Sequence, residues 1–361
     1  MKVSVLMGGV SPEREVSMAS GVQVARALRK AGHEVAAVDT TRGVLSQDDE
    51  DAILGRGVEP GSFPPGPLDL LASGGEGLVD RASPLRRAEM VFPVLHGGAG
   101  EDGTLQALLD LLEVPYVGSG RLGCALAMDK EISKRLFRDE GIPTPPWVVQ
   151  EVRGSGGTTD PDEGESPSRS ALEAEVLEVL DLPLIVKPPS GGSTLGLTLV
   201  RDAGELRPAV EESLKHEDRV LFEAYVAGRE LTVGVVGDEA LPVGEIIPQH
   251  ELFDYECKYQ PGMAEEIFPA RIPSDLANHL QELSLRVHRL LRLSDFSRVD
   301  FMVDGAGGAW CLEANALPGM TSNSLLPKAA HAAGIPFPEL CHRILEAGAS
   351  RYPRAGSPSG T

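Results

Sequence analysis

The alternation of strand and helix signals at the start of the chain limits its fold more than any other feature. An apolar run at residues 3–7 leads through Gly8 and Gly9 to a helix start at Ser11, and a second apolar run follows at 35–38. This order predicts a strand, a helix and a second strand, which together form a βαβ unit.

The same alternation continues along the chain. Strands are expected at 90–95 and 114–117, and helices at 104–112 and up to Gly141. Alternating strands and helices are typical of a parallel sheet covered by helices. We therefore predict an N-terminal parallel α/β domain at residues 1–122.

The second half of the chain has a different pattern of secondary-structure signals. From Leu184 onward the strand signals are closely spaced, with one helix expected after Asp202 and another at 276–291. This pattern indicates α+β layers instead of a doubly wound sheet. We predict a central domain at 123–216, a C-terminal domain at 217–350 and a flexible tail at 351–361.

Two stretches interrupt these patterns. Residues 55–87 are rich in Gly, Pro and Ser and have little periodicity, and residues 153–169 are more polar still. Both are expected to be flexible insertions, and the second is predicted to loop out from the central domain.

Composition excludes several classes of partner. The 361 residues carry a formal net charge of −21, whereas nucleic acids and acidic membranes are bound by basic surfaces. No apolar run approaches the roughly 18 residues that a membrane span needs, and the N-terminus does not resemble a signal sequence. The four cysteines form no CxxC pair and are expected to be free thiols. We therefore expect a cytoplasmic protein without a nucleic-acid or membrane partner.

The strands at 297–303 and 309–315 predict a polar face near the C-terminus. If Asp304 pairs with Ala309 across the glycine-rich turn, side-chain alternation brings four polar residues to one face. These are Arg298 and Asp300 on the first strand and Glu313 and Asn315 on the second. Their oxygen atoms suit Mg²⁺, which takes one or two carboxylates and completes its shell with water and phosphate. The alternative is a solvated, salt-bridged sheet face.

A glycine-rich stretch, 190–196, follows the strand at 184–187. Small residues between two strands let backbone N–H groups approach a phosphate, and Lys187 would add a positive charge. The stretch lacks the GxxxxGK[ST] pattern and opens no helix, which excludes a P-loop and a Rossmann motif. A plain hairpin turn is the alternative.

Two loops are expected at the carboxyl edge of the N-terminal sheet, where open α/β sheets bind ligands. The loop at 96–106 begins with His96, and the loop after the first strand contains Glu13. Glu13 is expected in the first turn of a helix, where a carboxylate suits the helix dipole and could receive an ammonium group. A structural role for His96 is the alternative.

The irregular segment at 249–268 is predicted to be a lid. Long loops with little structure of their own are often lids or linkers, and Phe253, Tyr255 and Tyr259 would serve little purpose in a linker.

Eight motifs occur in the order found in D-alanine:D-alanine ligases, and the chain resembles that family over residues 3–347 apart from the two insertions. The motifs are GGVSPEREVS, HGGAGEDGT, MDK, KPPSGGSTLG, FEAYVAGRE, YECKY, RVDFMV and EANALPGMTSNS. Any one motif could arise by chance, but the ordered set is specific. The resemblance implies a three-domain ATP-grasp architecture with ATP between the central and C-terminal domains.

The resemblance also implies the residues that bind ATP and metal. In this sequence they are Lys130, Lys187 and Lys258 for the phosphates, Glu223 and Val226 for adenine, Glu230 for the ribose, and Asp300, Glu313 and Asn315 for two Mg²⁺ ions. Mn²⁺ is the expected substitute for Mg²⁺. Whether a monovalent cation assists, as in some relatives, stays open.

The implied reaction joins two D-alanines through a D-alanyl phosphate. Glu13 would bind the ammonium group of the first substrate with the help of Ser193 and Tyr259. The remaining implied residues are His96 and Glu101 at the same end, Ser324 and the backbone of Leu325 for the second carboxylate, and Arg298 with the Gly319 N–H for the oxyanion. Closure of Lys258 and the lid would exclude water.

Tyr259 bears on specificity, because a tyrosine at this position accompanies dipeptide formation in the family and a phenylalanine accompanies D-lactate use. Phe253 and Ala224 depart from the tyrosine and lysine common in the family, which puts affinity in question but not the reaction class.

The alternative functions are a D-alanyl-D-serine or D-alanyl-D-lactate ligase, a catalytically silent ATP-binding homologue, and an oxidoreductase. The oxidoreductase is disfavoured because Gly8 and Gly9 do not form a GxGxxG motif. Family members are commonly homodimers.

Overall fold

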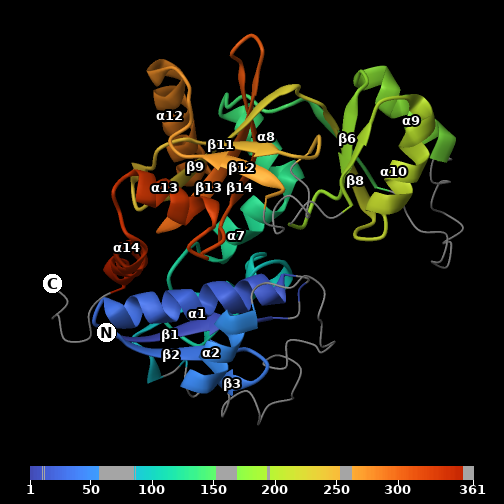
Figure 1. The fold of residues 1–361 in the computed structure, drawn as a ribbon. Coiled ribbons are helices and arrows are strands. Elements are labelled where there is room, and N and C mark those ends of the chain that lie inside the picture. Colours follow the sequence, from blue (N-terminus) through green and yellow to red (C-terminus); the bar gives the residue numbers. More distant parts are fainter. Residues whose placement is uncertain are drawn as a thin grey trace, which may run out of the picture.

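The computed structural model describes residues 1–9, 11, 13–56, 85, 87–151, 169–192, 196–252 and 262–352. Within this part the chain forms three sheets, each accompanied by helices (Figure 1). Most of the two predicted insertions, most of the predicted tail and the core of the predicted lid lie outside the described residues.

The N-terminal sheet has the strand order β3-β2-β1-β4, and β1 runs parallel to both β2 and β4. Its strands are β1 (Lys2–Met7), β2 (Glu34–Asp39), β3 (Gly43–Val44) and β4 (Met90–Pro93), and its helices are α1 (Arg14–Lys30), α2 (Gln47–Arg56) and α6 (Thr104–Leu111), with the short helix η1 (Gly98–Gly100). The predicted βαβ order is confirmed. It places the loops after β1 and β4 at the same edge of the sheet.

The prediction of a strand at 114–117 is wrong. Only a single parallel bridge forms there, between Val91 and Tyr116. Pro115 has no N–H to donate to a ladder, and the chain turns away at Gly118, whose φ is +95°. The segment therefore leaves the sheet after one bridge.

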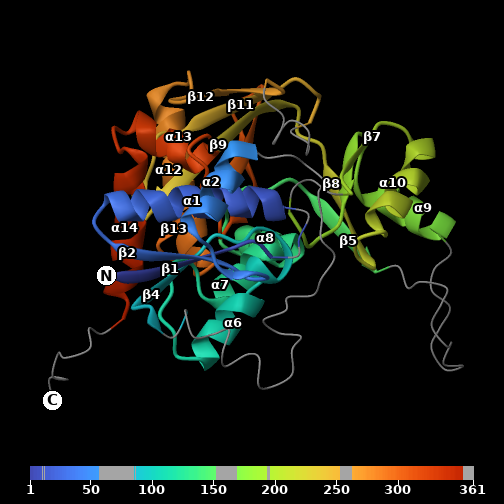
Figure 2. The same cartoon turned by 60° about the horizontal axis from the view of Figure 1, so that its bottom comes forward.

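The central sheet has the order β5-β8-β6-β7. Its elements are β5 (Trp147–Glu151), α9 (Arg169–Val179), β6 (Leu184–Lys187), β7 (Thr198–Val200), η2 (Ala203–Glu205), α10 (Leu206–Ser213) and β8 (Arg219–Ala224). Because β8 pairs with both β5 and β6, this sheet extends past residue 216, beyond which we expected the C-terminal domain. Figure 2 shows it standing to one side of the other two sheets.

The C-terminal sheet is antiparallel, with the order β12-β11-β9-β13-β14 and β10 beside β9. Its strands are β9 (Gly228–Val236), β10 (Glu239–Ala240), β11 (Gly244–Pro248), β12 (Ala264–Ile267), β13 (Phe296–Asp304) and β14 (Ala309–Asn315). Its helices are α12 (Ser274–Leu290), α13 (Leu325–Ala332) and α14 (Phe337–Ser350).

Two helices from the predicted central domain pack on the C-terminal sheet instead. Cys124 of α7 (Arg121–Met128) and Phe137 of α8 (Lys130–Asp139) share one buried apolar cluster with Val299 and Cys311 of β13 and β14. The three described cysteines are free and buried, in line with the thiol prediction. This packing carries the start of α8 to the boundary between the central and C-terminal sheets.

The first and last parts of the chain share a core. Helix α14 packs on α1, and apolar residues of both belong to one buried cluster (Figure 1). Arg351 extends this contact, because its Nη2 lies 2.7 Å from Asp295 Oδ2 and donates to the carbonyl of Gly118. Among the residues that the structure describes, none of the helices combines the length and the apolar character that a bilayer crossing requires.

Candidate active site

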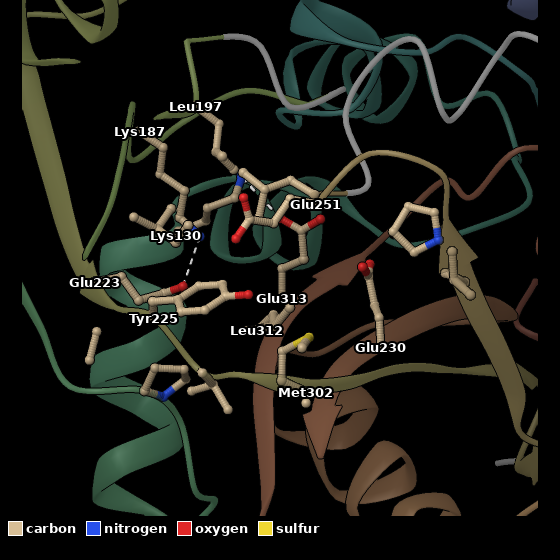
Figure 3. Close-up of a pocket in the computed structure, with 18 of the residues that line it drawn as sticks. Lys130, Lys187, Leu197, Glu223, Tyr225, Glu230, Glu251, Met302, Leu312 and Glu313 are labelled. Carbon is tan, nitrogen blue, oxygen red and sulfur yellow. Dashed lines mark hydrogen bonds and ion pairs between the residues drawn. The ribbon is translucent and has the colours of Figure 1, made fainter. Parts of the chain in front are cut away.

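A cavity of about 400 Å³ lies between the central and C-terminal sheets, close to the glycine-rich turn (Figure 3). Strands of both sheets line it, together with the start of α8. The predicted nucleotide residues that line it are Lys130, Lys187, Glu223, Val226 and Glu230, and the predicted metal ligand Glu313 is beside them. The structure thus gathers residues that lie far apart in the sequence around one pocket.

The two lysines already have anionic or carbonyl partners. Lys130 Nζ donates to the carbonyl of Gly191 at 2.8 Å and lies 3.2 Å from Glu313 Oε2. Lys187 Nζ lies 3.2 Å from Glu223 Oε1. Because the two ammonium groups line the same cavity as the glycine-rich turn, they could receive phosphate oxygens there.

The strand register on the polar face is partly as expected. Asp300 lies opposite Glu313, and Arg298 lies opposite Asn315, as the alternation predicts. The starting pair is wrong, because Ala309 pairs with Val303 and not with Asp304. A β-bulge between Asp300 and Phe301 shifts the register by one residue. It restores the pairing that brings the polar side chains together.

Asp300 is the centre of this face. Its two carboxylate oxygens accept hydrogen bonds from Thr232 Oγ1 at 2.6 Å, from Arg298 Nη2 at 2.8 Å and from Asn315 Nδ2 at 3.0 Å. It is only 6% exposed, so these contacts fix its orientation. Thr232 was not predicted, although its place opposite Asp300 on β9 follows once the strand pairing is known.

The polar face of β13 and β14 offers few carboxylates to a metal ion. In the described part of the chain, no group of three or more His, Cys, Asp or Glu side chains is arranged to hold one. Asp300, Glu313 and Asn315 supply two carboxylates and an amide, and Glu313 also lines the cavity. Such a set fits Mg²⁺ when phosphate and water complete the shell, because Mg²⁺ keeps several waters and uses few protein ligands.

A helix start lies beyond β14. Ser324 immediately precedes α13, and its Oγ accepts a hydrogen bond from the Thr321 N–H at 3.1 Å. A side chain at Gly319 would come within 2.9 Å of Ser324 Oγ, so Gly319 and Ser324 are neighbours. The N–H groups at the start of α13, beginning with Leu325, have no helical partners and suit a carboxylate.

The loops after β1 and β4 form the other end of the site. Glu13 immediately precedes α1 instead of lying in its first turn, and it is 9% exposed. His96 Nδ1 lies 3.6 Å from Glu101 Oε1, and Glu101 Oε2 accepts the Gly97 N–H at 3.0 Å. A side chain at Gly97 would lie within 2.9 Å of Glu13 Oε2. Glu13, His96 and Glu101 are therefore close together.

The glycine-rich turn approaches this end as well. A side chain at Gly192 would lie 3.6 Å from Glu13 Oε2 and 3.9 Å from Glu101 Oε2. Gly192 also lines the cavity that contains the lysines. The turn thus lies between the acidic loops and the pocket that contains Lys130 and Lys187.

The carboxylates control the charge of His96. Burial lowers the pKa of His96, but the hydrogen bond and charge of Glu101 and the charge of Glu13 outweigh burial and raise the pKa above its ordinary value. Its Nε2 is buried and has no hydrogen-bond partner among the described residues.

Three predicted residues, Ser193, Lys258 and Tyr259, lie outside the described residues. One buried residue that sequence reasoning missed is Lys134, whose Nζ lies 2.6 Å from Glu223 Oε2. It lies four positions after Lys130 on the same helix, and residues at this spacing share a helix face. That spacing was the available signal.

Comparisons with known proteins agree with this arrangement. A model of the D-ala D-ala ligase N-terminus matches residues 2–119, and a model of the D-ala D-ala ligase C-terminus matches residues 136–346. The D-alanine–D-alanine ligase of Syntrophotalea carbinolica is 38% identical over 353 residues, which cover 97% of this chain and 96% of that protein. The D-alanine–D-alanine ligase of Gloeobacter violaceus is 40% identical over 96% of this chain and 99% of that protein.

Solved structures agree with the family models. A D-alanine–D-alanine ligase from Bacillus anthracis complexed with ATP superposes with a TM-score of 0.72 at 30% identity, covering 97% of this chain and 98% of that one. The VanG D-Ala:D-Ser ligase from Enterococcus faecalis superposes with a TM-score of 0.77 at 27% identity, covering 96% and 99%. The ATP-grasp fold expected from the motifs is therefore confirmed, and the chain belongs to the D-alanine–D-alanine ligase family.

Proposed function

We propose that this protein joins two D-alanines into D-alanyl-D-alanine with ATP, through a D-alanyl phosphate, to supply peptidoglycan synthesis. The observation that carries the proposal is the contact of Gly192 with two chemically different regions. It lines the cavity of Lys130 and Lys187, and it lies against Glu13 and Glu101. An ammonium-bearing substrate held by the acidic loops would lie beside phosphates held by the lysines.

In the first step, a carboxylate oxygen of the first D-alanine attacks the γ-phosphorus of ATP, and ADP leaves. Glu13 holds the substrate ammonium group, with His96 and Glu101 beside it and with Ser193 and Tyr259 assigned from the family resemblance. Lys130, Lys187 and Lys258 offset negative charge on the phosphates. Glu223 and Val226 hold adenine, and Glu230 holds the ribose.

Asp300, Glu313 and Asn315 would hold two Mg²⁺ ions, which supply charge neutralisation on the phosphate oxygens when bound. Arg298 and Thr232 orient Asp300 through the hydrogen bonds described above. Mn²⁺ has the same ligand preference for oxygen and would substitute.

In the second step, the amine of the second D-alanine attacks the carbonyl carbon of the acyl phosphate, and inorganic phosphate leaves. Ser324 and the Leu325 N–H at the start of α13 receive the carboxylate of the second substrate. Arg298 and the Gly319 N–H stabilise the oxyanion that develops during attack. A lid that includes Lys258 and Tyr259 excludes water, which would otherwise hydrolyse the acyl phosphate.

D-Serine is the second candidate for the acceptor, because the fold superposes on a D-Ala:D-Ser ligase with a TM-score of 0.77. We also expect the enzyme to work in the cytoplasm as a homodimer, in keeping with the substrates and with the family resemblance. The reaction steps described above take place within one subunit and do not depend on the location or the oligomeric state of the enzyme.

The test is phosphate release from ATP and Mg²⁺ with D-alanine, run beside L-alanine, D-serine and D-lactate, with products identified by mass. D-Alanine-dependent turnover that yields the dipeptide is expected. ATP binding without turnover on any of these substrates would instead identify a silent homologue, and a mixed D-Ala-D-Ser product would favour the second candidate.

A further inference from the structure

Lys134 has no part in the proposed reaction, yet it occupies a costly position. Its side chain is fully buried, and it is not among the residues that line the cavity. Its Nζ lies 2.6 Å from Glu223 Oε2 and donates to Thr144 Oγ1 at 2.7 Å and to the carbonyl of Pro145 at 3.3 Å. A buried ammonium group is tolerated only when it is paired and hydrogen-bonded. Glu223 is its anionic partner.

Glu223 is shared between two lysines. Its Oε2 faces Lys134, whereas its Oε1 lies 3.2 Å from the Nζ of Lys187. Burial raises the pKa of Glu223, but the charges of Lys134 and Lys187 outweigh burial and leave the pKa below its ordinary value. One carboxylate thus lies between two lysine side chains, so the three groups formally carry one net positive charge. Burial lowers the pKa of Lys134, and the charge and hydrogen bond of Glu223 oppose this fall.

The geometry decides where that net charge lies. Glu223 is closer to Lys134 than to Lys187, and of the two lysines only Lys187 lines the cavity. Lys134 therefore neutralises most of the carboxylate, and the charge of Lys187 stays available to a phosphate. Without Lys134, Glu223 and Lys187 would form a neutral pair, and an incoming phosphate would compete with Glu223 for Lys187.

We propose that Lys134 is a positioning residue that neutralises Glu223 from behind the pocket and so leaves Lys187 free to bind an ATP phosphate. The inference rests on the proposed function, since it assigns the ligand of Lys187 as ATP. It adds a residue that acts only through Glu223 and does not touch the nucleotide.

The main variant is Lys134→Met, which keeps approximate side-chain volume and removes the charge. We expect the KM for ATP, and the Kd for a non-hydrolysable ATP analogue, to rise at least about tenfold, because an intact charge-assisted contact is lost. The KM for D-alanine should stay within about twofold, because the acidic loops bind that substrate independently. Arg135→Met is the matched control, because Arg135 is an exposed cation on the same helix.

A double-mutant comparison separates positioning from a structural role. If Lys134 acts by freeing Lys187, then Lys187→Met should weaken analogue binding much less in the Lys134→Met background than in the parent. A folded Lys134→Met protein with a parental KM for ATP, or equal costs of Lys187→Met in both backgrounds, would overturn the inference.

Lys134→Met could fail to fold because it leaves Glu223 buried beside a single lysine. The test is then a comparison of analogue binding by the single variant Glu223→Gln and the double variant Lys134→Met/Glu223→Gln. Thermal melting checks that both proteins fold. With the carboxylate removed, Lys134 should no longer matter, and the two proteins should bind the analogue within about twofold of each other. A further tenfold weakening in the double variant would overturn the inference.

A parent that does not bind the analogue would refute the proposed function itself, whereas parental binding with an unaffected Lys134→Met would refute only the role of Lys134.

Discussion

The two ends of the candidate site differ in the charged groups that they offer to a ligand. The cavity between the central and C-terminal sheets presents the cations Lys130 and Lys187, whereas the loops after β1 and β4 place Glu13 and Glu101 around His96. Phosphates suit the first end and an ammonium group suits the second. The comparison teaches that a strongly acidic chain can still offer a few local cations to an anion, whatever its overall charge.

The two ends also differ in how they are built. The acidic end consists of loops at the carboxyl edge of a mainly parallel sheet, where ligands of such sheets bind. The nucleotide end consists of side chains on strands and on the start of α8, which form ion pairs such as that of Lys130 with Glu313. Variants at each end should therefore affect different substrates.

The largest effect is expected from Glu313→Gln at the nucleotide end. Loss of one carboxylate from the proposed metal site should lower kcat by about a thousandfold, which corresponds to about 4 kcal/mol of transition-state stabilisation. Steady-state phosphate release at saturating ATP measures it. Glu265→Gln, an exposed carboxylate on the same sheet, is the control, and a near-normal rate for Glu313→Gln would remove this residue from the metal site.

The next prediction concerns the pH dependence of stability, and it compares a histidine of the C-terminal domain with the histidine of the site. Burial lowers the pKa of His288 on α12 to about 4 from an ordinary value of 6.5, whereas carboxylates raise the pKa of His96. Between pH 6.5 and about pH 4, His288 binds a proton in the unfolded chain but not in the folded chain. The free energy of unfolding should therefore fall as the pH decreases from 7 to 4, by up to about 3 kcal/mol from this residue.

Denaturant unfolding of parent and His288→Gln at several pH values checks this prediction. The variant should show a shallower loss of stability with acid, although its stability at pH 7 should be lower because its contact with Ser297 is altered. His279→Gln, exposed on the same helix, should keep the parental slope. Parallel curves for parent and His288→Gln would contradict the assignment.

A smaller effect is expected from Glu13→Gln at the acidic end. Loss of the proposed charge-assisted hydrogen bond to the substrate ammonium group should cost about 2 kcal/mol and raise the KM for D-alanine about thirtyfold. The KM for ATP should change little, because the nucleotide pocket is intact. Glu15→Gln, two residues away on α1, is the control. Equal changes in both KM values would show that the two ends are not independent.

The smallest effect is expected from Tyr259→Phe. Removal of the hydroxyl should raise the yield of D-alanyl-D-lactate relative to dipeptide by about threefold or more, because the family resemblance associates a phenylalanine at this position with D-lactate use. Products are quantified by mass with D-alanine and D-lactate together. An unchanged ratio would refute the specificity argument from Tyr259.

Much of the architecture followed from local periodicity. Alternating strand and helix signals predicted the β1-α1-β2 unit, and period-two alternation predicted that Asp300 lies opposite Glu313. These predictions succeeded because side-chain direction repeats regularly along a strand or a helix. The family resemblance, carried by ordered motifs, named residues that the structure then gathered around one cavity.

Other features depended on pairing between distant segments. The pair predicted at the hairpin turn was wrong, since Val303 and not Asp304 pairs with Ala309, and only the bulge restores the register. Periodicity also cannot tell which sheet receives a strand, and β8 joined the central sheet past the predicted boundary.

The sequence by itself determined the order of elements, the polar face of β13 and β14 and the family. Only the tertiary structure decided that Lys134 is buried against Glu223 and that Gly192 contacts both ends of the site. The physical reason is that a periodic pattern specifies which way a side chain faces. Its partner and its desolvation depend on segments that the fold brings together from distant parts of the chain.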